Sequence, residues 1–136
     1  YRGDRTRKIL FNGSLNLGKY YNGDRNSVGA TVIFNGGYRF RTEFGIDKNV
    51  LKFPSTTIDA DIYTLRIKYN HSVNLFNSLY FQYNAADERL VSNFRFNLIH
   101  SPLSDLFIVY SNISDLSGEN TNNGMIALKF TKLFTF

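Results

Sequence analysis

The strongest constraint on the fold is an alternation of apolar and polar residues with a period of two, repeated along the whole chain. In one segment Phe94 and Phe96 alternate with Asn93, Arg95 and Asn97. Successive side chains of a β-strand point to opposite faces, so this period indicates half-buried strands. Ala, Glu and Met are scarce, whereas Asn, Thr, Tyr, Phe and Ile are common, which is typical of strands and turns. The sequence therefore predicts an all-β fold.

The segments with this alternation predict eight strands. They lie near 6–20, 26–39, 43–53, 58–70, 75–85, 89–100, 105–113 and 124–136. Polar loops are expected at 21–25, 54–57, 86–88 and 114–123, and shorter turns at 40–42, 71–74 and 101–104. The repeating unit is a hairpin, and Asn22-Gly23 is a strong turn signal. We expect an antiparallel up-and-down sheet closed into an eight-stranded barrel, which would span residues 1–136 as one domain.

The length of the strands indicates the environment. Strands of about 10–14 residues are long for a globular protein but fit the 9–11 residues that a tilted strand needs to cross a bilayer. A uniformly apolar face can point into a soluble barrel or outwards to lipid. The chain has no Cys and two His, which excludes a disulfide scaffold and makes a zinc site improbable.

The residues of the polar face favour the membrane alternative. An eight-stranded membrane barrel has a lumen just wide enough for side chains, which ion pairs and amides would fill. We expect Glu43 and Asp47 to pair there with Arg66, Arg95 and Lys129. The full set of lumen residues that we expect is Lys8, Arg39, Glu43, Asp47, Arg66, Lys68, Arg95 and Lys129.

The end of the chain carries a more specific signal. An amphipathic strand with Phe130 and Phe134 closes on Phe136. It resembles the C-terminal signal that the assembly machinery of bacterial outer-membrane barrels reads. Aromatic residues near predicted strand ends suit the girdles of such barrels: Tyr20 or Tyr21, Tyr38, Tyr69, Tyr83 and Phe136.

Several segments resemble one bacterial family. They are 18–24, 79–84, 93–96, 104–112 and 128–136. They are similar to the C-terminal barrel of outer-membrane proteins of unknown function that carry an N-terminal carbohydrate-binding-like domain of the family-9 type. The resemblance implies that these strands are the C-terminal part of a larger barrel, without a catalytic motif, and that a covalently attached N-terminal domain exists outside this sequence. The opening residues 1–4 look like the inside of a loop, so we expect a fragment of a longer chain.

Other chemistry has weaker support. His71-Ser72 and His100-Ser101, with Asp105 nearby, are ordinary turn residues, and we expect no catalysis. Four carboxylates at the predicted loop end lack the spacing of a calcium loop: Asp59, Asp61, Asp87 and Glu88. The net charge of +5 is spread over all strands, so we expect no nucleic-acid partner. No cofactor or metal is expected.

We therefore expect a protein of the bacterial outer membrane that serves as a membrane anchor or a narrow pore. Its partners would be outer-membrane lipid and the barrel-assembly machinery. The first alternative is a soluble lipocalin-like barrel that binds an apolar ligand. The second is an outer-membrane lipid-modifying enzyme, for which His71 and His100 are the candidate bases.

Overall fold

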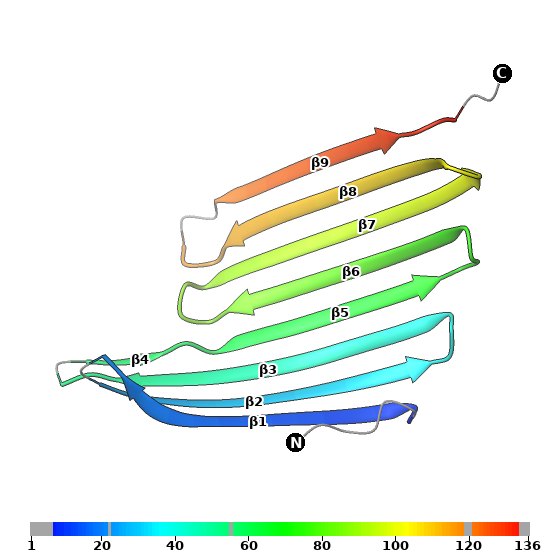
Figure 1. Cartoon of the computed structure of the whole chain (residues 1–136). Helices are drawn as coiled ribbons and strands as arrows, with labels where there is room; N and C mark the ends of the chain where they lie inside the picture. The colour runs from blue at the N-terminus through cyan, green and yellow to red at the C-terminus, as the bar shows by residue number, and fades with distance from the viewer. Residues whose placement is uncertain (1–6, 22, 55, 119–120, 134–136) are drawn as a thin grey trace.

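A computed structural model describes residues 7–21, 23–54, 56–118 and 121–133. Within these ranges the chain forms nine strands and no helix. The strands are β1 (Ile9–Tyr20), β2 (Gly23–Gly36), β3 (Phe40–Lys52), β4 (Thr57–Asp59), β5 (Ile62–Asn70), β6 (Leu75–Asn84), β7 (Arg89–Ser101), β8 (Ser104–Asp115) and β9 (Asn122–Phe130). All pairings are antiparallel, and the order across the single sheet follows the chain, with β4 beside β3 (Figure 1). The predicted all-β antiparallel meander is confirmed.

The sheet is open. β1 pairs with β2 and β9 pairs with β8, and the described parts of these two outer strands do not pair with each other (Figure 1). The eight-stranded barrel that the sequence led us to expect is therefore not closed in this structure.

The predicted strand at 58–70 is interrupted. β4 and β5 keep one continuous register against β3, because Val50 pairs with Asp59 and Asp47 pairs with Ile62. Between them, the side-chain Nδ2 of Asn49 donates to the carbonyl oxygen of Ala60 at 3.3 Å. The backbone N–H of Ala60 also donates to the carbonyl oxygen of Asn49 at 2.8 Å, so the chain stays bound to β3 across this interruption.

The first short turn lies earlier than predicted. The prediction placed it at 40–42, but these residues begin β3 and the turn spans 37–39. Gly37 adopts a φ of +75°, a conformation that glycine adopts without steric cost. The turn position is thus set by the Gly36-Gly37 pair, which the alternation had absorbed into a strand.

The connections sort to two ends of the sheet, as predicted. The turns at 37–39, 71–74 and 102–103 share the end that we call the turn end. The strand ends that face the opposite loop end are those at which β1 passes to β2, β3 to β4, β6 to β7 and β8 to β9 (Figure 1).

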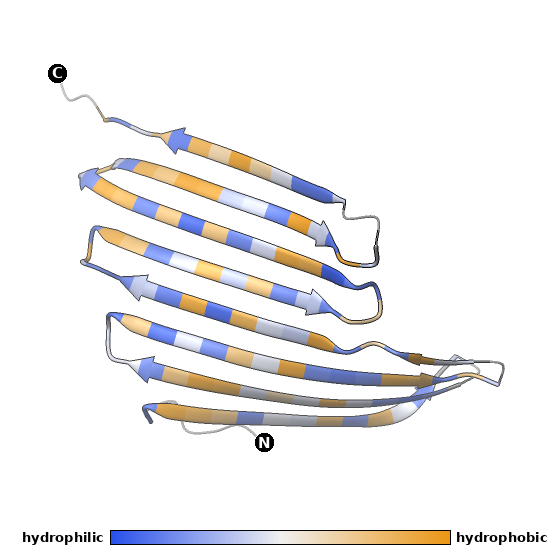
Figure 2. Ribbon diagram, turned by 180° about the vertical axis from the view of Figure 1, so that it is seen from behind, coloured by the Kyte–Doolittle hydropathy of each residue, from blue (hydrophilic) through white to orange (hydrophobic). Residues whose placement is uncertain are grey.

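The cross-strand register separates two chemically different faces. One row runs through directly paired residues of eight strands, and we call it the central row: Ile9, Phe34, Thr42, Ile67, Leu79, Phe94, Tyr110 and Ile126. Its side of the sheet is the apolar face. The adjacent row lies on the polar face: Leu10, Ile33, Glu43, Arg66, Tyr80, Asn93, Ser111 and Met125. Figure 2 shows the resulting alternation of hydropathy along the strands.

The sheet has almost no hydrophobic core. The accessible surface is 9910 Å², whereas a folded soluble monomer of this mass exposes about 7,300 Å². Among the described residues only Leu10 and Ile33 are buried apolar side chains, while Leu17, Ile126 and Leu128 are 68%, 72% and 66% exposed. No second layer covers the described strands. The apolar face is therefore not shielded from solvent by any described part of this chain.

Candidate functional site

The centre of the polar face is a small ion-pair network on β3 and β5. Glu43 accepts a hydrogen bond from Nε of Arg41 at 2.8 Å, and its other carboxylate oxygen lies 3.5 Å from Nη1 of Arg66. Residues two apart on a strand share a face, so Arg41 and Glu43 are neighbours, while Arg66 is the direct cross-strand partner of Glu43. The guanidinium of Arg66 also lies over the ring of Tyr80, 5.2 Å from its centroid. One carboxylate thus serves two arginines.

The other predicted cations on the strands of this face, Lys68, Arg95 and Lys129, form no ion pair with a described residue. Lys68 is the direct cross-strand partner of Arg41 and has no ion-pair partner in the described part of the chain. Arg95 lies over the ring of Phe107, 5.4 Å from its centroid. Lys129 stands opposite Phe107 on the neighbouring strand. The predicted pairing of Glu43 with Arg66 is present, whereas Arg95 and Lys129 lie apart from it.

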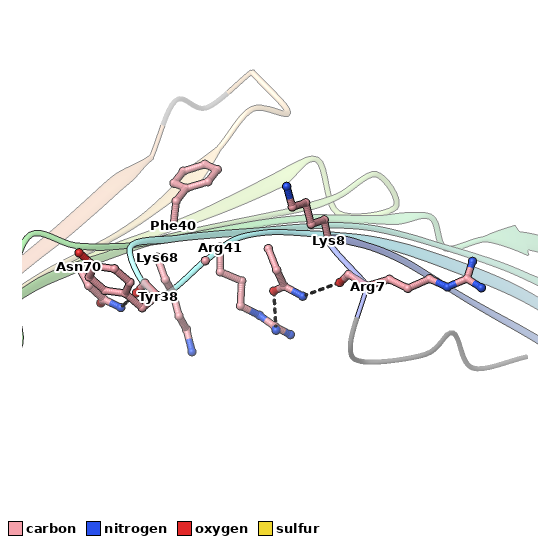
Figure 3. Close-up of a pocket in the computed structure, with 9 residues that line it drawn as sticks. Arg7, Lys8, Tyr38, Phe40, Arg41, Lys68 and Asn70 are labelled. Atoms are coloured by element: carbon pink, nitrogen blue, oxygen red, sulfur yellow. Dashed lines mark hydrogen bonds between the residues drawn. The ribbon is translucent and has the colours of Figure 1, made fainter.

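Three further predicted residues lie elsewhere. Asp47 is on the polar face but forms no ion pair within the described ranges, and its side chain lies beside Gly29. Arg39 belongs to the turn, where its Nε donates to the hydroxyl of Tyr38 at 2.7 Å. Lys8 precedes β1 and points to the same side of the sheet as Phe40 (Figure 3).

Arg41 is a residue of the polar-face network that was not predicted from the sequence. The prediction placed it inside a turn, so it was not assigned to a face. Its Nη1 also donates to Oδ1 of Asn35 at 2.9 Å, which fixes the guanidinium from two sides. The glycine pair at 36–37 is the signal that would have set the turn correctly and placed Arg41 on the polar face.

Charge is distributed unevenly along the polar face. We call the part from the row of Glu43 and Arg66 to the turns the turn half. It carries the cations Arg41, Arg66, Lys68, Arg95 and Lys129, and among its described residues the acids Glu43 and Asp105. The opposite half is balanced, with Arg25 and Arg89 against Asp47 and Asp115. The turn half is therefore a net cationic surface.

Several aromatic residues lie at the borders of the apolar face, although others such as Phe81 and Phe94 lie in its interior. Tyr63 and Tyr83 stack at the loop-side limit of β5 and β6, with ring centroids 6.3 Å apart. Tyr69 lies at the turn-side limit of β5, and its ring meets that of His71 edge-on at 4.5 Å. Phe130 lies on the apolar face at the end of β9 and stacks on His100 at 5.4 Å. Phe134 and Phe136 of the predicted assembly signal lie outside the described residues.

Only one of the two histidine-serine pairs lies in a turn: His71-Ser72 does, whereas His100 and Ser101 end β7. The Oγ of Ser72 accepts hydrogen bonds from the backbone N–H groups of Asn74 and Leu75, at 3.2 and 3.1 Å. This is the local role that serine commonly has in turns. The described residues contain no group of three or more His, Cys, Asp or Glu that could hold a metal ion. Among these residues there is also no helix long and apolar enough to cross a membrane.

Comparisons of the chain with protein-family models, with curated proteins and with solved structures found no match. The family resemblance stated above therefore remains an expectation.

Proposed function

We propose that the sheet is part of the wall of a bacterial outer-membrane β-barrel, with its apolar face against lipid and its polar face towards the lumen. The short turns would then be periplasmic and the loops extracellular. The protein would act as a membrane anchor or, within a barrel of more strands, as a narrow pore. Outer-membrane lipid and the barrel-assembly machinery would be its partners.

The observation that carries this proposal is the burial on the polar face. Every buried residue within the described parts of β1–β3 lies on that face: Leu10, Ser27, Gly29, Ile33 and Gly45. Side chains converge on the concave side of a curved sheet and spread apart on the convex side. In Figure 3 the first strands arch with Phe40 on the outer side and with Arg41 and Lys68 on the inner side. A lipocalin-like barrel would need the reverse, with the apolar face inside.

The limits of the apolar face give a second line of support. On β1 the apolar stretch runs from the central row towards the loop end and stops at Leu17. On β9 it runs from the central row towards the turn end and stops at Phe130. On β6 they extend both ways, from Leu75 to Tyr83. The apolar band is therefore inclined to the strands.

The inclination is close to the strand tilt of a membrane barrel, although slightly smaller. The band shifts by about six residues over seven strand-to-strand steps, which with spacings of about 3.3 and 4.8 Å gives a tilt of about 30°. Barrel strands tilt by roughly 35–45°. From Leu75 to Tyr83 the band measures about 26 Å along the strand, or about 23 Å when tilted. Membrane barrels have a band about 25 Å tall.

Charges mark one border of this band. On the apolar face, the charged residues of the described strands all lie on its loop side: Lys19, Asp24, Lys48, Lys52 and Asp59. A charge at the bilayer midplane would cost about 2–4 kcal/mol, and the cost falls towards the interface. This placement matches a lipid-facing band with a solvated rim.

Refolding in detergent tests the proposal. The purified protein is run on an SDS gel with and without boiling, because a closed barrel migrates differently until heat unfolds it. A heat-dependent mobility shift would indicate that the strands close by themselves as an anchor with a filled lumen. A need for detergent without a shift would indicate part of a larger barrel. Monomeric solubility without detergent would contradict the proposal and favour the soluble apolar-ligand barrel.

A further inference from the structure

The cationic turn half contains an arrangement that works against folding. Arg41 and Lys68 form a direct cross-strand pair on β3 and β5. Like charges placed directly opposite each other destabilise a sheet. Beyond Lys68 the same row continues through Ser78 to Arg95. This row therefore holds three cations, and among the described residues only Arg41 of the three forms an ion pair. Their mutual repulsion lowers the stability of the sheet.

The side chains of the pair are free to act together. Both point to the same side of the sheet (Figure 3). Arg41 uses two of its five N–H donors on Glu43 and Asn35, so three remain. The ammonium of Lys68 has no ion-pair partner in the described part of the chain.

Open space adjoins both cations. A hollow of about 530 Å³ lies at the turn end of β1–β5, and its lining includes Arg7, Asn35, Arg41, Lys68 and Asn70. The described residues of this lining include no carboxylate. Glu43 accepts from Nε of Arg41 and Asn35 accepts from Nη1, so both N–H groups of Nη2 and one of Nη1 remain for another acceptor. An anion in the hollow would meet positive charge from more than one direction.

The geometry points to a binding site for the oxyanion of a small phosphorylated solute, held between the guanidinium of Arg41 and the ammonium of Lys68. A guanidinium presents paired donors that match phosphate oxygens, and an ammonium adds a compact point charge. The bound anion would neutralise the repulsion between the two cations. Because the polar face is the lumen side of the proposed barrel, the solute would bind from the lumen; this assignment of the side rests on the proposed function.

Calorimetric titration of the full-length protein in neutral detergent with pyrophosphate tests the site. We expect saturable binding that weakens as salt is raised, because screening acts on exposed charges. Lys68→Gln and Arg41→Gln should each weaken binding about tenfold, the loss expected for one charge-assisted contact. Arg89→Gln is the matched control, since Arg89 lies in the balanced half of the same face, opposite Asp115, and it should leave the affinity unchanged.

A stability measurement keeps the test valid if a variant folds poorly. Pyrophosphate should raise the unfolding temperature of the unmodified protein but not that of Lys68→Gln, and Lys68→Gln without ligand should be at least as stable as the original because the repulsion is gone. No binding of pyrophosphate, or equal binding by Lys68→Gln and Arg89→Gln, would overturn the site. Binding of phosphatidylglycerol with no response to pyrophosphate would also overturn it, because the anion would then be a lipid headgroup.

The experiments distinguish failure of the anion site from failure of the proposed membrane barrel. A protein that needs detergent but does not bind pyrophosphate would refute the site and leave the membrane barrel intact. A protein that is soluble without detergent and binds pyrophosphate through Arg41 and Lys68 would retain the site and refute the barrel.

Discussion

Glu43 and Arg66 face each other directly across β3 and β5, and their carboxylate and guanidinium lie 3.5 Å apart. The same carboxylate accepts a hydrogen bond from Arg41. This triad links three positions of the polar face through one acidic side chain, and it lies in the turn half at its border with the balanced half.

Reversal of the charge at Arg66 should destabilise the fold more than reversal at Arg95. In Arg66→Glu two carboxylates would face each other across the strands, whereas Arg95 has an aromatic ring as its neighbour. Both side chains of the Glu43–Arg66 pair are partly exposed, so we expect a loss of only about 1 kcal/mol in the free energy of unfolding. Denaturant titration in detergent measures this loss. Equal losses of unfolding free energy after reversal at Arg66 and at Arg95 would show that the Glu43–Arg66 pair adds no stability of its own.

The two faces of β9 should respond differently to a new charge. Leu128 lies on the apolar face and Ala127 lies next to it on the polar face, and both are exposed. In lipid vesicles Leu128→Arg should cost about 2–4 kcal/mol of folding free energy, because the charge would enter the bilayer. Ala127→Arg should cost much less. Similar costs for the two variants would argue that neither face contacts lipid.

Gly45 should not tolerate a larger residue. It lies on the polar face opposite Thr64, and a Cβ at this position would be 2.5 Å from Oγ1 of Thr64. Gly45→Ala should therefore destabilise the sheet by about 1–3 kcal/mol, the usual cost of overpacking. Thermal unfolding measures the effect, with Gly18→Ala as the control because nothing lies within 4 Å of a Cβ there. The double variant Gly45→Ala/Thr64→Ala should recover much of the loss, and a failure to recover it would point to a cause other than this contact.

The inclination of the apolar band predicts different depths within the central row. Phe34 lies near the turn-side limit of the band on β2, Phe94 lies at its middle on β7, and Tyr110 lies at its loop-side limit on β8. Single tryptophans at these positions should differ in their quenching by lipids brominated at different depths, with Phe94→Trp the deepest. Equal depths would mean that the strands do not tilt.

The sequence predicted the faces of the strands better than their ends. Alternation depends on a local period of two, so residues such as Phe94 and Arg95 could be assigned to opposite faces without any knowledge of the partner strands. The turn at 37–39 was misplaced because Tyr38 and Phe40 continue the alternation through the hairpin, and only the positive φ of Gly37 marks the reversal. The break at Ala60 and Asp61 was missed because no glycine or proline marks it within the predicted strand at 58–70.

The candidate site was predictable only in part. Glu43 and Arg66 were assigned to the polar face by alternation, and the register then placed them opposite each other. The pairing of Arg41 with Lys68 could not be predicted, because it depends on the length of the β2–β3 turn and on the register between β3 and β5. Lys8 was wrongly expected to follow the alternation of β1, since it precedes the first residue of that strand.

Fluorescence from two neighbouring residues of β6 tests the central claim most directly. The chain has no tryptophan, so Tyr80→Trp and Phe81→Trp each introduce a single probe by a conservative change. Phe81 lies on the apolar face and Tyr80 on the polar face. In vesicles of brominated phospholipid, strong quenching of the probe at position 81 with little quenching at position 80 is the result that a lipid-facing apolar surface predicts. Little quenching at both positions, or the reverse order, would contradict the assignment of the apolar face to the membrane.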